Sequence, residues 1–215
     1  MHTKAEVSEI IRLLEKCYPV PYTDLKYSKD YELLFAARLA AQCTDARVNT
    51  VTPDLFAKYP SLEAFAAADV AELEKIIFSC GFYKTKARDI IAAAGVLLDE
   101  FQGQVPDEME DLLKLPGVGR KTANLMLGDI FKKPAVVVDT HCIRLSNRIG
   151  FVTDMKNPDK IETVLRNILP PDKSSDFCHR LVLHGRAVCT ARKPKCENCC
   201  IAKFCRYFNE TPRER

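Results

Sequence analysis

"LPGVGRKTAN", residues 115–124, places a proline, two glycines and two adjacent cations between two predicted helices. Pro116 ends the first helix, and the pattern predicts a helix–hairpin–helix over about 108–128. Gly117 and Gly119 allow backbone angles that other residues disfavour, and they carry no side chain to block a ligand. The unpaired amides and positive dipole at the start of the next helix suit a phosphate. A plain corner between two helices, with a glycine cap, fits the same residues equally well.

Two cations, Arg120 and Lys121, follow this turn. A cation near a helix N-terminus is destabilised by roughly a few tenths of a kcal/mol. Partial loss of solvent would favour the neutral amine further, and a neutral amine is a nucleophile that can form a Schiff base. The alternative interpretation is a solvated lysine, or one that pairs with a phosphate.

Helical patterns extend over nearly all of the chain. Apolar residues at helical spacing give the N-terminal segment one buried face: Val7, Ile10, Ile11 and Leu14. Asp69 with Glu72 forms a helix start, and a long helix is predicted from Tyr83 to Phe101. "PAVVVD", residues 134–139, is the one β-like run and is too short for a sheet. Further helices are predicted near residues 140–149, 158–169 and 175–188.

These patterns predict an all-α protein with two domains. The central domain covers residues 23–132, has six helices and contains the hairpin. The N-terminal helix, residues 1–22, joins residues 133–215 in the second domain.

Charge is unevenly distributed along the 215 residues, although the net charge is only +3. Residues 180–215 hold nine Lys/Arg against three Asp/Glu, whereas the remaining residues hold 23 basic against 26 acidic side chains. This distribution indicates a polyanionic partner or a solvated basic tail. No apolar run approaches the roughly 18 residues that cross a bilayer, and no export signal is evident, so we expect a cytoplasmic protein.

Ten cysteines are many for such a chain, and five of them lie between residues 189 and 205. Clustered thiols in a reducing compartment indicate a metal centre, whereas the scattered ones fit small core residues. Four of the clustered thiols follow a C-x6-C-x2-C-x5-C pattern: Cys189, Cys196, Cys199 and Cys205. Zinc and a [4Fe–4S] cluster both accept four thiolates, and the spacing alone does not choose between them.

Taken together, the motifs resemble the helix–hairpin–helix DNA glycosylase superfamily, and most closely its endonuclease III family. The matching stretches run in order along nearly the whole chain: "LAAQCTDARVN" (39–49), "GFYKTKA" (81–87), "LPGVGRKTAN" (115–124), "VVVDTHCIRLSNRIG" (136–150), "LHGR" (183–186) and the cysteine pattern. The resemblance implies a bifunctional glycosylase that removes oxidised pyrimidines, with a DNA cleft between its two domains. It also implies double-stranded DNA with damaged bases or abasic sites as the partner, and a monomer.

Lys121 matches the nucleophile of the family and Asp139 matches its catalytic aspartate. The implied reaction starts with a damaged nucleotide extruded from the duplex. Lys121 attacks the sugar C1′, the base leaves, and the Schiff base makes the 2′ proton acidic, so that β-elimination cuts the strand 3′ to the abasic site. Taken in isolation, Asp139 is most simply the N-cap of a helix.

The resemblance also assigns DNA contacts. Gln42 and the residue after Gly81, here Phe82 where the family usually has leucine, would fill the space left by the extruded nucleotide. Without the family, Gln42 would be a surface amide and Phe82 a core residue. His141 would lie near the DNA or help to orient the site, although a histidine bonded within a helix start fits equally. Asp45 matches a position near the damaged base and also fits a helix cap.

For the cysteine cluster, the resemblance favours [4Fe–4S] and leaves Cys200 outside the ligand set. Three cations lie in the loop between the first two ligands and form a candidate phosphate clamp: Arg192, Lys193 and Lys195. Two alternatives remain: a glycosylase for another lesion, such as a pyrimidine dimer or a mismatch, and a non-catalytic DNA-binding protein.

Overall fold

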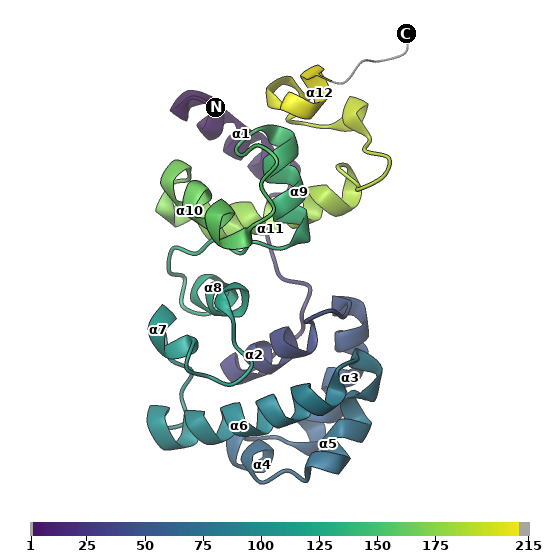
Figure 1. Cartoon of the computed structure of the whole chain (residues 1–215), viewed down its shortest axis with the longest axis vertical. Helices are drawn as coiled ribbons and strands as arrows, with labels where there is room; N and C mark the ends of the chain where they lie inside the picture. The colour runs from purple at the N-terminus through teal and green to yellow at the C-terminus, as the bar shows by residue number, and fades with distance from the viewer. Residues whose placement is uncertain (1, 211–215) are drawn as a thin grey trace. The chain divides into compact units, whose positions relative to one another are not determined.

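The computed structural model describes residues 2–210 and is helical throughout (Figure 1). Within these residues there is no strand, which confirms the all-α prediction. The β-like run Ala135–Val138 is buried but forms no ladder, as its length predicts. In the described part of the chain, every helix is too short or too polar to cross a membrane.

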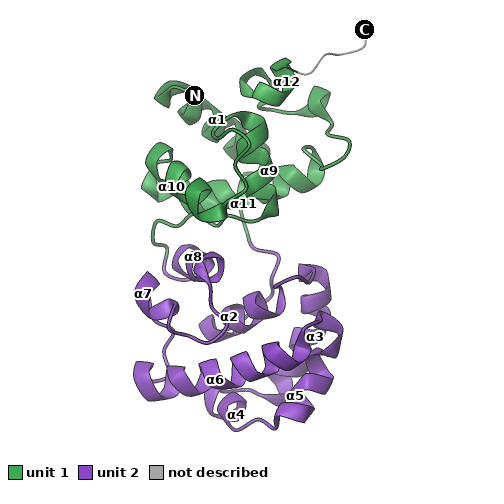
Figure 2. Cartoon of the chain, in the orientation of Figure 1, with its two compact units in different colours: residues 1–22, 132–215 green, residues 23–131 purple. Residues whose placement is uncertain are grey.

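The chain divides into two compact units (Figure 2). Unit 1 consists of residues 1–22 and 132–215, and unit 2 consists of residues 23–131. Unit 2 contains seven α-helices and one 3₁₀ helix: α2 (Asp30–Leu39), α3 (Asp45–Lys58), α4 (Leu62–Ala66), α5 (Val70–Ile77), η1 (Phe78–Cys80), α6 (Tyr83–Phe101), α7 (Met109–Leu112) and α8 (Arg120–Asp129). Unit 1 contains α1 (Lys4–Cys17), α9 (Thr140–Ile149), α10 (Pro158–Ile168), η2 (Pro171–Lys173), α11 (Ser174–Ala187), η3 (Cys196–Asn198), η4 (Ala202–Phe204) and α12 (Arg206–Glu210).

Unit 2 is built around α6, the longest helix, whose bounds match the predicted ones. The Asp69 side chain accepts a hydrogen bond from the Glu72 amide and starts α5 as predicted. Phe35 of α2 and Phe65 of α4 lie edge to face with ring centroids 4.9 Å apart, and both are fully buried. Such aromatic pairs add to the stabilisation from burial alone, so they fix α2 and α4 within one core.

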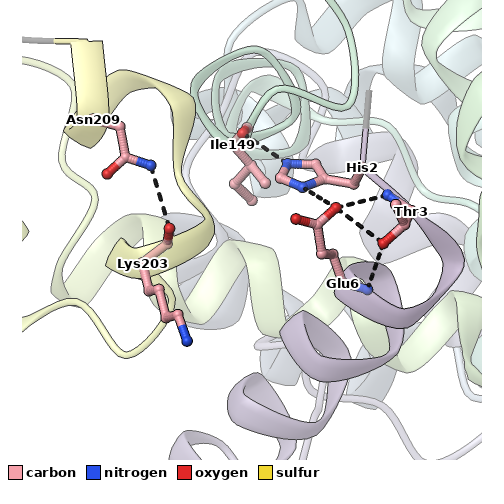
Figure 3. A network of polar contacts seen from close by, with 6 residues as sticks. All are labelled: His2, Thr3, Glu6, Ile149, Lys203 and Asn209. Atoms are coloured by element: carbon pink, nitrogen blue, oxygen red, sulfur yellow. Dashed lines mark hydrogen bonds and ion pairs between the residues drawn. The ribbon is translucent and has the colours of Figure 1, made fainter.

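Unit 1 is held together by contacts between distant parts of the chain. Thr3 and Glu6 form a reciprocal capping box that starts α1, and His2 reaches the carbonyl of Ile149 at the end of α9, with 3.1 Å between Nε2 and O (Figure 3). The predicted apolar face of α1 is buried, and α1 packs against α11. The N-terminal segment therefore completes a core built mainly from the C-terminal third of the chain.

The hairpin differs from its prediction in one respect. Its first helix, α7, is a single turn that ends at Leu112, before Pro116. Leu112 and Leu115 are both buried, and the chain leaves the helix between them. Unit 2 has seven α-helices, one more than the six predicted.

Candidate functional site

Gly117 forms the tight point of the hairpin. Its φ of +76° is open to glycine and strained for other residues, and a Cβ there would lie 2.6 Å from Arg38 Nε and 2.8 Å from Asp89 Oδ2. Those two side chains form a half-buried ion pair with 2.7 Å between Nε and Oδ2, joining α2 to α6. The hairpin thus rests directly on an ion pair of the unit 2 scaffold.

Gly119 has a different role from Gly117, and the prediction of unusual backbone angles at this residue is wrong. Its φ is −105° with ψ of 176°, which is extended backbone open to any residue, and a Cβ there would meet nothing within 4 Å. Gly119 is the N-cap of α8 and provides no side chain to bond the following amides. The first turn of α8 therefore presents its amides without a capping group of its own.

We expect Gly117→Ala to destabilise unit 2 by about 1–3 kcal/mol, because the added methyl group imposes backbone strain and displaces the Arg38–Asp89 pair. The matched change Gly119→Ala should alter stability by less than about 0.5 kcal/mol, since its surroundings are open. Urea denaturation of both variants provides the measurement. Equal destabilisation by the two alanines would contradict the separate roles.

Lys121 is the second residue of α8 and follows Arg120, and both side chains are exposed. The next residues of the helix, Ala123 to Gly128, are buried in unit 2 and hold the first turn rigidly. The exposed amine therefore projects from a fixed base, at a helix start that its N-cap residue does not cap with a side chain. Any desolvation of this amine has to come from a bound ligand.

Asp139 is the N-cap of α9, as the simplest interpretation predicts. Its carboxylate accepts a hydrogen bond from the Cys142 amide, with 2.7 Å between Oδ1 and N, and the residue is half-buried. One carboxylate oxygen is enough for this cap, which leaves the group able to act on a ligand as well. Lys121 belongs to unit 2 and Asp139 to unit 1.

His141 is bonded within its helix start. Its Nδ1 lies 3.1 Å from a guanidinium nitrogen of Arg144, and a Cβ on Gly185 of α11 would lie 2.6 Å from the same ring nitrogen. The absence of a side chain at Gly185 is thus what lets α11 approach α9. The half-buried ring fits the structural alternative, and its contact with DNA stays a prediction.

Gln42 and Phe82 both stand on exposed turns of unit 2. Each has a left-handed backbone conformation, with φ of 54° for Gln42 and 47° for Phe82. Phe82 is 66% exposed, so its interpretation as a core residue is wrong. Non-glycine residues rarely adopt this conformation, and such strain concentrates at functional sites.

Asp45 does not cap α3, contrary to the structural alternative. The N-cap is Thr44, whose hydroxyl accepts a hydrogen bond from the Arg47 amide. Asp45 is the first residue within the helix and is half-buried. Threonine takes the cap because its backbone is extended there, as a cap requires.

The cysteine loop lines a small cavity. Its walls comprise four thiols and five largely apolar residues: Cys189, Cys196, Cys199, Cys205, Val188, Pro194, Ala202, Tyr207 and Phe208. Burial raises the pKa of Cys199 to about 11, and the other three thiols add to the rise. Within residues 2–210, no three His, Cys, Asp or Glu side chains converge on a single metal ion; the four thiols instead surround a shared space. Four mutually repelling thiolates fit a multi-iron group that neutralises them.

Cys200 lies outside this cavity, in accord with the family spacing. Its thiol lies near that of Cys17 at the end of α1, which adds to the rise that burial causes in the pKa of Cys200. Cys80, Cys142 and Cys178 are buried as the core interpretation predicts, whereas Cys17 is exposed. All ten cysteines carry free thiols.

His184 and Arg148, which the sequence did not predict, form hydrogen bonds with sulfur atoms of the cysteine cluster. His184 is 1% exposed; its Nε2 lies 3.2 Å from Cys199 Sγ and its Nδ1 lies 3.0 Å from the Tyr18 hydroxyl. Burial lowers the pKa of His184 to about 4, so the neutral ring donates to sulfur and accepts from the phenol. Arg148 donates to Cys189 Sγ at 3.4 Å and to the Thr190 carbonyl at 2.7 Å. Donors of this kind orient metal ligands and tune the metal.

The loop between the first two thiols is closed by its own backbone. Thr190 donates its hydroxyl to the Lys193 carbonyl at 2.6 Å, and the Lys195 amide donates to the Val188 carbonyl at 2.9 Å. The side chains of Arg192, Lys193 and Lys195 are all exposed on this loop. It therefore presents three cations from a constrained backbone.

Comparisons with known proteins agree with this arrangement. Residues 35–171 match the family model described as HhH-GPD superfamily base excision DNA repair protein, and residues 189–205 match the iron–sulfur binding domain of endonuclease III. Endonuclease III of Synechocystis sp. is 46% identical over 94% of this chain and 92% of its own. Endonuclease III of Escherichia coli is 40% identical over 95% of this chain and 96% of its own.

A solved structure of a trapped endonuclease III–DNA covalent intermediate is also similar. It superposes with a TM-score of 0.92 and 39% identity, covering 98% of this chain and 99% of the other. The cofactor is a [4Fe–4S] cluster, since the iron–sulfur match spans the cysteine loop. The chain therefore belongs to the endonuclease III family, within the HhH-GPD superfamily of base excision DNA repair proteins.

Proposed function

We propose that the chain is a bifunctional DNA glycosylase and AP lyase that excises oxidised pyrimidines and then cuts the strand 3′ to the abasic site. The observation that carries this proposal is the exposed amine of Lys121 on a rigid helix start that the N-cap residue Gly119 does not cap with a side chain. That position offers a nucleophile within reach of a nucleotide whose phosphate binds the same helix end.

In the proposed reaction, the Lys121 nitrogen bonds to C1′ of the extruded nucleotide as the bond from C1′ to the base breaks. The base leaves with the electron pair of that bond and takes up a proton. Loss of the amine proton and opening of the sugar give the Schiff base, whose 2′ proton is acidic. Its removal expels the 3′ phosphate, and water then releases the enzyme. Asp139 stabilises positive charge on the sugar and accepts protons from the amine.

We expect Asp139→Asn to lower the excision rate by about 10²-fold or more while leaving stability within about 0.5 kcal/mol. Asparagine caps a helix as well as aspartate does, so the bond to the Cys142 amide survives the change. Single-turnover excision and thermal unfolding are the two measurements. Asp69→Asn, the same change at the cap of α5, is the control. A normal rate in Asp139→Asn would exclude the aspartate from the chemistry.

DNA affinity in this proposal comes from two phosphate sites. One is the turn with Gly117, Gly119 and Arg120, where the N-cap residue of α8 has no side chain to occupy the helix start. The other is the cation loop of Arg192, Lys193 and Lys195, which is exposed and constrained. Both bind the backbone, so they position the duplex without reading its sequence.

We expect simultaneous replacement of Arg192, Lys193 and Lys195 by glutamine to weaken DNA binding uniformly across sequences. The slope of log affinity against log salt should fall by roughly 2–3, about one for each lost phosphate contact. Titration of an undamaged duplex over a salt series measures the slope. An unchanged slope would remove this loop from the interface.

Gln42 and Phe82 fill the vacated space of the duplex in this proposal, and Asp45 lies near the damaged base. Support comes from the exposure of the two turns and from their left-handed backbones. Phenylalanine in place of the usual leucine enlarges the wedge and changes the preference for the base opposite the lesion. His141, in the first turn of α9, orients the start of that helix.

The decisive test uses duplexes that each carry one defined lesion, with borohydride to reduce any Schiff base. The proposal expects covalent trapping and 3′ cleavage for oxidised pyrimidines, and much weaker reaction for pyrimidine dimers and mismatches. Trapping restricted to dimers or mismatches would move the chain to another lesion class. We further propose a monomer, because one chain supplies every assigned residue. We also propose a cytoplasmic location, which fits ten cysteines that form no disulfide.

A further inference from the structure

Lys86, in the first turns of α6, is a buried cation that the proposed chemistry does not use. The residue is 1% exposed, and its ammonium donates to the carbonyl of Leu39 at 2.7 Å and to the carbonyl of Cys80 at 2.9 Å. Burial lowers the pKa of Lys86, which reflects the cost of removing a charge from water. A position with so large a desolvation cost calls for a specific role.

The two carbonyls that Lys86 binds lead directly into the two exposed turns. Leu39 is the last residue of α2, and the chain then turns to Gln42. Cys80 is the last residue of η1, and the chain continues through Gly81, at φ of +70°, to Phe82. Carbonyls at helix ends carry partial negative charge, so one ammonium joins both segments at their starts.

A second contact ties the same two segments together. The thiol of Cys43, which follows Gln42, lies near that of buried Cys80 and adds to the rise that burial causes in the pKa of Cys80. Phe82 itself is followed by Tyr83, whose ring packs against Phe78 with centroids 4.8 Å apart. The turns are therefore fixed at their bases, while the Gln42 and Phe82 side chains stay in solvent.

We propose that Lys86 is a positioning residue that holds Gln42 and Phe82 at a fixed separation, so that both enter the duplex together. The inference rests on the proposed function, in which these side chains fill the space of an extruded nucleotide. A wedge opposes restacking of the bases only if it does not yield, and a loosely held turn would lose conformational freedom on every insertion. Because Lys86 fixes both turns in the folded protein, their conformational freedom is lost on folding and not again at each insertion into DNA.

The test replaces Lys86 by methionine, which keeps the chain length and removes the charge. Excision is measured in single turnover on two duplexes with the same oxidised pyrimidine, one paired with its complement and one mispaired. Opening a mispaired site needs less help from a wedge. We expect about a tenfold loss of rate on the paired lesion and less than about a threefold loss on the mispaired one.

Leu97→Ala is the matched control, because Leu97 is fully buried in the same helix and contacts neither pinned carbonyl. It should slow both duplexes by the same factor, if at all. Equal losses on both duplexes in Lys86→Met, or no loss, would overturn the positioning role. If the methionine variant does not fold, Lys86→Gln keeps a hydrogen-bond donor at this position. It should again lose more excision rate on the paired lesion than on the mispaired one, by a smaller factor. An equal loss of rate on both duplexes would overturn the role. Wild type inactive on both duplexes would instead refute the proposed function.

Discussion

Replacing Lys121 by glutamine should abolish borohydride trapping and reduce strand cleavage at abasic sites by at least about 10³-fold. The amide nitrogen of glutamine is not nucleophilic, so no bond to C1′ can form. Stability should stay the same or rise by roughly a few tenths of a kcal/mol, because a cation leaves the N-terminal turn of α8. Loss of trapping and cleavage without loss of stability would show that Lys121 acts as the nucleophile and is not a structural lysine.

Lys58→Gln provides the control for this experiment. Lys58 ends α3 in the same unit and forms an exposed ion pair with Glu72, with 2.9 Å between Nζ and Oε2. Its loss should leave trapping unchanged, since surface pairs contribute little. Trapping that persists in Lys121→Gln would mean that another amine attacks the sugar, and the proposed mechanism would fall.

Replacing Cys199 by serine should prevent binding of the cluster. The cysteine loop, which depends on the cluster, should then become disordered. Serine is a weaker ligand for iron, and Cys199 also accepts the hydrogen bond from His184. We expect loss of bound iron and visible absorbance, a destabilisation of unit 1 by about 5 kcal/mol, and DNA binding that is weaker by about tenfold or more. Iron analysis, absorbance and a binding titration measure these effects.

Cys200→Ser is the control because this neighbour points to Cys17 rather than into the cavity. It should retain iron, colour and DNA affinity. A colourless Cys200→Ser would show that five thiols, not four, share the centre. If the wild-type protein contains zinc instead of iron, the assignment of a [4Fe–4S] cluster is contradicted.

Sequence periodicity predicted the regular parts of the fold well because burial there follows the helical repeat. The bounds of α6 and α9 agree with their predictions, and the capped starts at Asp69 and Asp139 are confirmed. The first hairpin helix was predicted too long. "EMEDLLKL" has good helical propensity, but the helix ends at Leu112, and Pro116 disfavours a helical backbone at the residue before it, Leu115.

The candidate site was predicted mainly through motifs, and the residues that support it were not. Without the family resemblance, the sequence predicts Phe82 as a core residue, because no local pattern shows that the backbone at Gly81 directs the Phe82 side chain into solvent. Lys86 and His184 are buried polar side chains whose partners lie far away in sequence, at Leu39 and Tyr18. Periodicity reports which face of a helix is apolar, and it says nothing about such partners.

The discontinuous composition of unit 1 has a consequence for biosynthesis. Helix α1 is synthesised more than 150 residues before α11, yet its buried face packs on α11. Unit 2 is contiguous and can fold as soon as residues 23–131 are out. The apolar face of α1, formed by Val7, Ile10, Ile11 and Leu14, therefore lacks its final packing partner while unit 2 folds, and unit 1 can complete its core only after α11 has been synthesised.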